Sequence, residues 1–305
     1  MDLKLIDEAV AAYKKDASES DAARLEFFRK LYEIQQNRAD AIAEADGYEP
    51  LPERDGDQDY IDAVPLLSQR SCPIDPTEFA QTCSDIAQHM ADNAGLEDDV
   101  AKALRTLDWS DFCNKADLEK AGSMPPLFVE DCLRSFDDFG VDAAVPANIF
   151  MMVVSFAIRA HIQDVAAKAY AAVSDDAKTG NHARPLVCPV CGAPASLSVV
   201  ESGVGIDGRA RTQYCGTCGT AWPFDRLRCG VCGTQNPSHL HYFHIEGDSA
   251  HRLLNCEECG QYERVVFEED LDKPLVNEVE DVVMARLDRV ALDPRFRKET
   301  AADEK

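Results

Sequence analysis

Four Cys-x-x-Cys pairs lie in the last two fifths of the chain, and they repeat at a fixed interval. The pairs are Cys188/Cys191, Cys215/Cys218, Cys229/Cys232 and Cys256/Cys259. The third pair follows the first by 41 residues, and the fourth follows the second by 41, so each unit reads C-x2-C-x23-C-x2-C. A tetrahedral metal ion takes four thiolates from two such pairs. The sequence therefore predicts two four-cysteine metal sites, formed in sequence order.

Other residues repeat with the cysteines. A glycine follows every pair, where a tight turn favours a positive φ angle: Gly192, Gly219, Gly233 and Gly260. The same 41-residue offset relates Val190 to Val231, Asp207 to Asp248 and Arg211 to Arg252. Each unit is too small to hold a core alone, and a metal ion would supply folding energy on the order of 10 kcal/mol or more. Thiol–disulfide exchange or four disulfides would fit two equal units poorly.

The composition is typical of a soluble intracellular protein with two or three domains. The chain has 305 residues, of which 45% are hydrophobic. Residues 1–8 are acidic and amphipathic, without the basic start and apolar stretch of a secretory signal. The longest apolar run, residues 149–158, is too short to span a membrane. Twelve cysteines without an export signal favour reduced, metal-binding thiols. We expect a cytoplasmic protein without membrane insertion.

The net charge of −25 is distributed unevenly. Residues 1–180 carry a net charge of −19, residues 181–262 carry −1 and residues 263–305 carry −5. An acidic surface repels phosphate backbones, which argues against nucleic acid as a partner. The charge would suit a cationic partner, although a high negative charge also serves solubility alone.

The elements that must position the cysteine pairs follow from hydrophobic periodicity. Apolar residues recur at three- and four-residue steps in five segments before the pairs: 3–13, 25–42, 79–90, 129–136 and 147–173. The second of these helices has a start signal at residues 18–21. Residues 47–76 are predicted to be a long irregular connection and residues 174–185 a polar linker. After the last pair, residues 276–290 predict a closing helix.

These observations predict an α+β protein. An acidic, all-α N-terminal domain (residues 1–180) precedes two tandem small four-cysteine modules (186–222 and 227–268). A closing C-terminal helix (274–292) and a disordered tail (297–305) complete the chain.

The remaining cysteines and most histidines have simpler explanations. Cys83, Cys113 and Cys132 accompany apolar residues and are expected in the core. Cys72 stands in a loop, and a reactive role remains open for it. Residues 239–244 resemble a strand with alternating faces. Five histidines are expected to be surface or partner-contacting groups, with metal ligation as the alternative: His182, His239, His241, His244 and His251. His89 and His161 are expected to be structural.

One motif match is rejected. Residues 203–208 fit the string G-x-G-x-x-G, but that fingerprint binds dinucleotides only between a strand and a helix. Here it lies between Cys191 and Cys215, with no helical pattern after it, and a hairpin turn is expected. We find no convincing nucleophile–base pattern, phosphate-binding loop or acid/base pair, so the sequence predicts no enzyme.

The cysteine pairs and their neighbours resemble the FdhE formate dehydrogenase accessory proteins. The resemblance rests on Cys188-Pro189-Val190-Cys191-Gly192, on Tyr214-Cys215-Gly216-Thr217-Cys218 followed by Trp222, on Arg226 and Arg228 before Cys229-Gly230-Val231-Cys232, on Leu240-His241-Tyr242 and on Cys256-Glu257-Glu258-Cys259-Gly260-Gln261-Tyr262. Chain length, the acidic helical half and the closing helix are also similar to that family.

The resemblance implies a cytoplasmic maturation factor for a molybdenum- or tungsten-containing formate dehydrogenase. Such a factor would bind the catalytic subunit before or during its export, and the enzyme's activity would depend on it. The resemblance also implies rubredoxin-like, or zinc-ribbon-like, β modules whose eight cysteines bind metal. It favours iron, whereas zinc is the more usual ion of purely structural sites.

Two other functions compete with this reading. A small rubredoxin-type electron carrier would need reversible redox chemistry at both sites. A zinc-ribbon nucleic-acid-binding protein would need a basic stripe with exposed aromatic residues. For the maturation factor, the segment between the two modules offers candidate partner-binding residues: Trp222, Arg226 and Arg228. The alternative for the two arginines is surface pairing with Asp225 and nearby acids.

Overall fold

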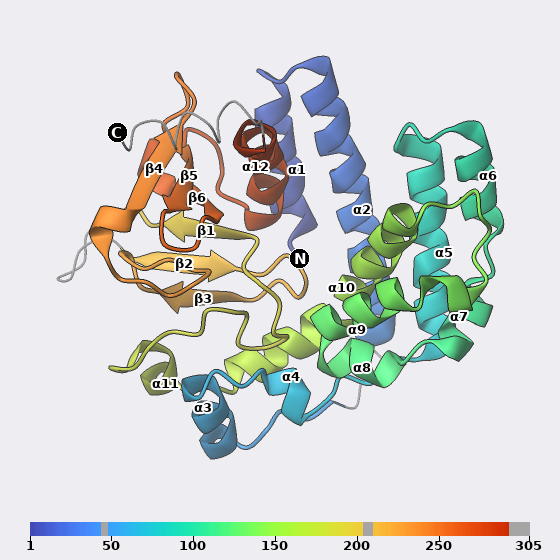
Figure 1. The fold of residues 1–305 in the computed structure, drawn as a ribbon, viewed down its shortest axis with the longest axis horizontal. Helices are drawn as coiled ribbons and strands as arrows, with labels where there is room; N and C mark the ends of the chain where they lie inside the picture. Colours follow the sequence, from blue (N-terminus) through green and yellow to red (C-terminus); the bar gives the residue numbers. More distant parts are fainter. Residues whose placement is uncertain (44–47, 204–209, 293–305) are drawn as a thin grey trace. The chain divides into compact units, whose positions relative to one another are not determined.

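The chain forms two compact units. The structure, a computed structural model, describes residues 1–43, 48–203 and 210–292. The helical unit comprises Met1, residues 27–193 and residues 215–220, and the sheet unit comprises residues 2–26, 194–214 and 221 onward. Figure 1 shows the elements of both units. The module boundaries predicted from the sequence remain predictions.

The helical unit is built around one long apolar helix, α10 (Ala147–Ala171), which packs against α5 (Pro76–Asn93) and α9 (Pro125–Arg134). Phe150 of α10 is fully buried among aromatic rings. The ring of Trp109 stacks on it at 5.1 Å, and that of Phe112 meets it edge-on at 5.0 Å. Such pairs add to the free energy of apolar burial and fix the helices around α10.

Shorter helices complete this unit, and several of them differ from expectation. The segment predicted as a long irregular connection contains α3 (Glu53–Ile61) and α4 (Leu66–Gln69), and the predicted linker contains α11 (Asp175–Thr179). These predictions were wrong because short helices leave little periodicity. The other short helices are α6 (Asp98–Thr106), α7 (Trp109–Lys115) and α8 (Leu118–Ser123), with a 3-10 turn at Phe136–Phe139. α2 (Glu19–Ala43) is as long as α10 and belongs to this unit from residue 27 onward.

The sheet unit joins the two sequence repeats in one six-stranded sheet of order β3-β2-β1-β6-β5-β4. Each repeat supplies an antiparallel meander: β1 (Leu197–Val200), β2 (Arg211–Tyr214) and β3 (Ala221–Phe224) from the first, β4 (Leu240–His244), β5 (His251–Cys256) and β6 (Tyr262–Phe267) from the second. Parallel pairing of β1 with β6 connects them, with Val199 opposite Val266. The first strand of the first repeat therefore pairs with the last strand of the second repeat.

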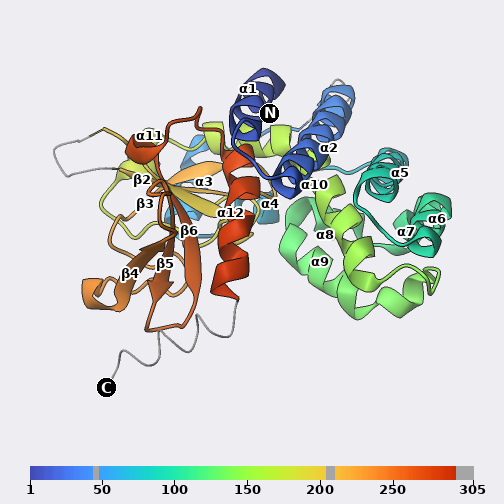
Figure 2. The same ribbon diagram turned by 90° about the horizontal axis from the view of Figure 1, so that it is seen from above.

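Both faces of this sheet are apolar at its centre. Because side chains alternate along a strand, Val199 and Val266 point to one face while Val200 and Val265 point to the other. On the first face α12 (Asn277–Ala291) packs its Met284 and other apolar residues against the strands. α1 (Leu3–Lys14) packs beside α12, as Figures 1 and 2 show. The predicted first and closing helices are confirmed.

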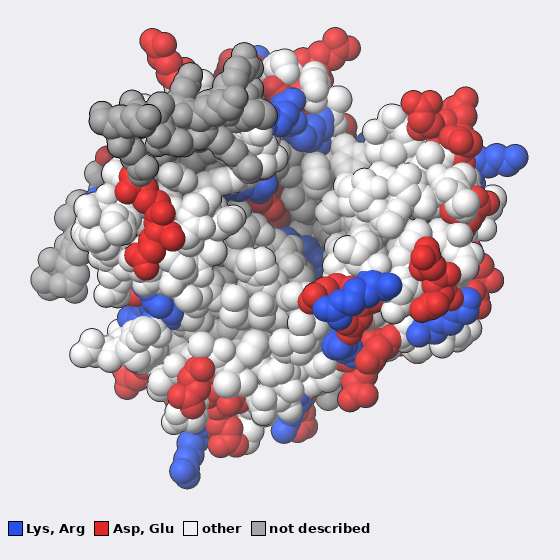
Figure 3. All heavy atoms as spheres, viewed as in Figure 1, with Lys and Arg blue, Asp and Glu red and all other residues white. Residues whose placement is uncertain are grey.

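The surface charge and the burial of the most apolar helix describe the outside of the protein. On the face shown in Figure 3, acidic and basic side chains are scattered in small groups. α10 is long and apolar enough to cross a membrane, but 72% of its most apolar window is buried within the protein, as in a core helix. All but the first residue of the turn expected at residues 203–208 lies outside the described residues, and so does the whole tail expected at 297–305.

Candidate metal centres

All four Cys-x-x-Cys pairs form the same turn, here called a knuckle. The first cysteine donates its backbone N–H to the carbonyl five residues later, as from Cys188 to Ala193 (2.7 Å) and from Cys229 to Thr234 (2.9 Å). Its own carbonyl accepts from the glycine four residues later, at 2.8–3.0 Å in all four knuckles. Those glycines have φ between 69° and 82°, as the sequence predicted.

The knuckles bring the sulfurs together in two sets of four. Cys188, Cys191, Cys215 and Cys218 form the first site, and Cys229, Cys232, Cys256 and Cys259 form the second, with the ligand atoms of each within 4.8 Å of one another. Facing Sγ atoms lie 3.5 and 3.6 Å apart in the first site and 3.9 and 3.8 Å apart in the second. A tetrahedron with metal–sulfur bonds of about 2.3 Å has edges of about 3.8 Å, whereas a disulfide needs about 2.05 Å. The geometry fits two four-thiolate metal ions in sequence order.

The first site is buried in the helical unit. All four of its cysteines are buried. The N–H groups of Leu66 and Leu67, at the start of α4, donate to the carbonyls of Pro189 and Val190 at 2.9 and 3.0 Å. On the second knuckle, the guanidinium of Arg159 donates to the carbonyl of Gly216 at 3.0 Å. A metal ion here would therefore fix α4 and α10 to the knuckles.

The second site lies at the end of the sheet and faces solvent on one side. Cys232 is exposed and Cys259 is half-buried. Behind the site, the Glu263 carboxylate accepts from the Gly230 N–H at 2.6 Å and from the buried Arg211 guanidinium at 2.5 Å. The two sites thus share ligands and turns but differ in their protection from water.

The surroundings of the sulfurs make metal binding and folding interdependent. Burial raises the pKa of the Cys188 thiol well above its ordinary value. Burial also opposes ionisation of Cys218, yet hydrogen bonds from the neighbouring cysteines and from Thr220 hold its pKa well below the usual range. Burial in this site thus opposes the thiolate form that a metal ion needs. A divalent cation supplies the charge that four thiolates require.

The difference in exposure predicts different metal lability. We expect a chelator to remove the ion of the second site at least about ten times faster than that of the first, because exposed Cys232 can be reached without unfolding. Metal released over time, counted by atomic spectrometry, should show two phases of one ion each. Cys232→Ser should abolish the fast phase alone. Single-phase release of both ions would contradict this assignment.

The structure places the three partner-binding candidates in different environments. Trp222, in β3, is fully buried, so its indole is not exposed at the surface. Arg226 is exposed. Arg228 is mostly buried; its Nη1 lies 3.2 Å from the Asp225 carboxylate and its Nε donates to the Gly233 carbonyl at 3.3 Å. Arg228 therefore braces the third knuckle, and Arg226 is the candidate that remains accessible.

The other cysteines are buried, as expected of core residues. Burial raises the pKa of Cys113 and of Cys132 to about 12. Cys72 is also buried, and its thiol donates to the backbone carbonyl of His161 at 3.4 Å. His161 itself is buried beside Thr82, and burial lowers its pKa to about 4, which supports a structural role.

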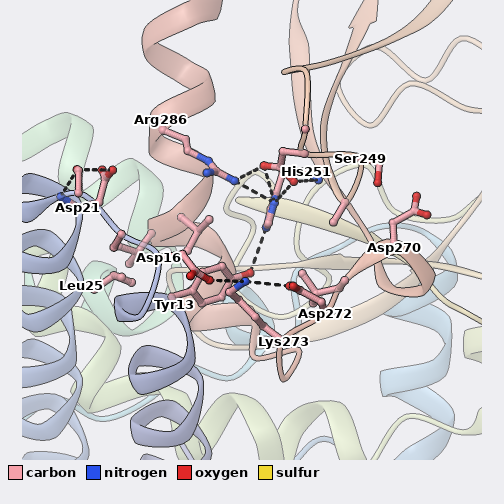
Figure 4. A pocket seen from close by; sticks show the side chains of 18 of the residues that line it. Tyr13, Asp16, Asp21, Leu25, Ser249, His251, Asp270, Asp272, Lys273 and Arg286 are labelled. Carbon is pink, nitrogen blue, oxygen red and sulfur yellow. Dashed lines mark hydrogen bonds and ion pairs between the residues drawn. The ribbon is translucent and has the colours of Figure 1, made fainter.

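His251, expected at the surface, lies inside the sheet unit, so that prediction was wrong. Its Nδ1 lies 2.8 Å from Asp248 and its Nε2 lies 2.8 Å from Glu280 of α12, whose carboxylate also accepts from the Tyr13 hydroxyl at 2.7 Å. Arg286 pairs with Asp248 on the same side. Tyr13, Asp248, His251 and Arg286 border a cleft of about 420 Å³, which Figure 4 shows. The Asp-x-x-His spacing was the sequence signal, but Glu280 and Tyr13 are too distant along the chain to be inferred.

The environment of His251 predicts pH-dependent stability. Burial alone would lower its pKa, but hydrogen bonds and negative charge from Asp248 and Glu280 outweigh burial and raise it. A raised pKa adds stability that is fully present below about pH 6.5 and is lost as pH rises through the folded-state value. The urea midpoint of the wild type should therefore exceed that of His251→Gln most near pH 6, and the difference should shrink towards pH 9. A pH-independent difference would contradict this explanation.

Comparisons with known proteins agree with this architecture. Residues 187–226, which contain the first site, match the family model for the central domain of FdhE. "Protein FdhE" of Escherichia coli O1:K1 is 29% identical over 113 residues, and that of Salmonella arizonae is 31% identical over the same length. The resemblance to the FdhE family is confirmed. The alignment covers 37% of this chain and about a third of the length of these FdhE relatives.

A solved structure extends the likeness to the fold. The crystal structure of the FdhE protein from Pseudomonas aeruginosa superimposes with a TM-score of 0.55 and 17% identity. It covers 97% of this chain and 91% of the FdhE chain. A helical N-terminal region, a sheet with two four-cysteine clusters and a final helix are thus an FdhE-like fold, as the sequence predicted.

Proposed function

We propose that this protein is a cytoplasmic maturation factor that binds the catalytic subunit of a molybdenum- or tungsten-containing formate dehydrogenase. The observation that carries the proposal is the pair of four-thiolate sites within an FdhE-like fold that spans nearly the whole chain. The factor acts by binding its client, and the client's activity depends on that complex. Catalysis has no part in this proposal.

The main role of the two metal ions would be to stabilise the fold. The first site is closed by its own helical unit, as in structural metal sites, and its knuckles anchor the start of α4. Zinc and iron both accept four thiolates at the observed spacing. The FdhE resemblance favours iron, which would add a redox function at the solvent-facing second site.

Complementation of a host that lacks this gene tests the proposal. Wild-type protein should restore formate dehydrogenase activity, while Cys188→Ser should not, because it removes the first site. The amount of catalytic subunit should be measured by immunoblot in the same cells. Full formate dehydrogenase activity in the gene-deficient host would contradict the maturation role.

One observation favours a second candidate, a rubredoxin-type electron carrier. Cys232 and Cys259 bring the second site close to solvent, as electron transfer to a partner requires. Iron-loaded protein would then show a reversible one-electron redox couple. A host that lacks the gene would keep an active formate dehydrogenase. The large helical unit has no role in such a carrier, so we place this candidate second.

A further inference from the structure

The two metal sites are equivalent in the sequence repeat but not in what covers them. Val190 and Val231 occupy the same position in the first and third knuckles, 41 residues apart. Val190 is fully buried, whereas 49% of Val231 is exposed. Leu227, just before the third knuckle, is 56% exposed. Since the turns are alike, the difference lies in the residues that pack on each site.

The first knuckle is covered by a short helix start from the same chain. Pro65 precedes α4, and a side chain added at Gly192 would meet the Pro65 ring at 3.1 Å. The next two N–H groups, of Leu66 and Leu67, bind the carbonyls of Pro189 and Val190. Both leucines are buried. A proline-led, apolar helix start thus fits the outer face of this knuckle.

The second knuckle is covered by a cation. Arg159 is buried and donates to the Gly216 carbonyl, and its guanidinium lies 3.3 Å from the position of a Cβ on Gly219. Four thiolates around a divalent ion carry a net charge of −2, so a nearby guanidinium stabilises the ionised cluster. This contact and the helix start together close the first site.

At the second site the surface that corresponds to the Arg159 contact is open among the described residues. A Cβ on Gly260, the equivalent of Gly219, would meet nothing within 4 Å in residues 1–43, 48–203 and 210–292. The fourth knuckle carries the exposed Glu257 and Glu258 where the second carries Gly216 and Thr217. Their carboxylates lie 2.7 Å from His241 and 3.6 Å from His239, two partly exposed histidines. Because an imidazole is mostly uncharged at neutral pH, these contacts leave the negative charge available. An apolar patch beside the third knuckle therefore adjoins an acidic one at the fourth.

We propose that the solvent-facing second site is a docking face for a helix start of another protein, which covers it as α4 and Arg159 cover the first. The bound segment has a proline followed by two large aliphatic residues that pack on Val231, and an arginine that faces Glu257 and Glu258. The charge of the cluster and the two glutamates complements that arginine. The identity of the partner, the formate dehydrogenase subunit, rests on the proposed function. The contact at the second site does not depend on that function.

A peptide from the chain itself tests the contact. The probe is a fluorescent peptide with the sequence of residues 62–71, which includes Pro65, Leu66, Leu67 and Arg70, added to the full-length, metal-loaded protein. We expect saturable binding that Val231→Glu weakens at least about ten-fold while two ions per chain are retained. Leu133→Glu changes an equally exposed aliphatic residue of the helical unit and should leave binding unchanged. Absence of saturable binding, or equal binding by Val231→Glu, would overturn the proposal.

Capture of the client separates this inference from the proposed function. If wild-type protein recovers a formate dehydrogenase subunit and Val231→Glu recovers at least about ten-fold less, the docking face is supported. Equal recovery by both would overturn the docking face and leave the function standing, whereas no recovery by the wild type would count against the function alone. Sedimentation gives the remaining outcome: a wild-type dimer that Val231→Glu converts to monomers would make a second copy the occupant and overturn the assignment.

Discussion

Cys188→Ser is expected to remove one of two metal ions and to destabilise the helical unit severely. Cys188 is fully buried in the first site, and its knuckle holds the start of α4. A structural four-thiolate ion contributes on the order of 10 kcal/mol, which is comparable to the whole stability of a domain. Soluble recovery should fall about ten-fold or more, and the remaining protein should hold one ion. Metal counting together with circular dichroism measures both effects.

Two matched variants separate metal loss from other effects. Cys229→Ser removes the other ion and should preserve the helical content, because all four cysteines of the second site belong to the sheet unit. Cys83→Ser places a hydroxyl in the core without touching a knuckle and should keep both ions. Retention of two ions by Cys188→Ser or Cys229→Ser would show that the knuckles do not pair in sequence order.

The second large effect concerns the buried ion pair beneath the third knuckle. The Arg211 guanidinium is fully buried and binds Glu263, the Ser198 hydroxyl and the Arg228 carbonyl. Arg211→Met would leave the Glu263 carboxylate buried without its cation, which costs about 3–5 kcal/mol. The double variant Arg211→Met/Glu263→Met should lose less free energy of unfolding than the two single variants lose together, because it leaves neither charge buried without its partner.

Arg252 provides the control, since it occupies the same repeat position 41 residues later. Its pair with Asp270 is more exposed, so Arg252→Met should cost about 1 kcal/mol or less. Urea unfolding of metal-loaded protein measures all four variants. Equal losses from Arg211→Met and Arg252→Met would contradict the role assigned to burial.

The metal sites were predictable because a knuckle is a local structure. Two cysteines and a following glycine determine the turn, and the 41-residue repeat pairs the knuckles without knowledge of the fold. Long amphipathic helices were predictable for a similar reason, since α1 and α12 each show a complete apolar stripe.

Features that depend on distant contacts were not predictable. Parallel pairing of β1 with β6 joins residues 67 positions apart, as Ser198 with Val265, and leaves no local pattern. The burial of His251 depends on Tyr13 and Glu280, and the cover on Val190 depends on α4. Two equal sequence repeats therefore become a buried site and a solvent-facing one through surroundings that the repeat does not encode.

An oxygen-free pull-down from the native host tests the central claim most directly. Bound proteins would be identified by mass spectrometry, and metal would be counted in the same sample. The proposed function predicts recovery of a formate dehydrogenase catalytic subunit with two ions per chain. Reproducible absence of that subunit, with an electron-transfer reductase or nucleic acid recovered instead, would contradict it.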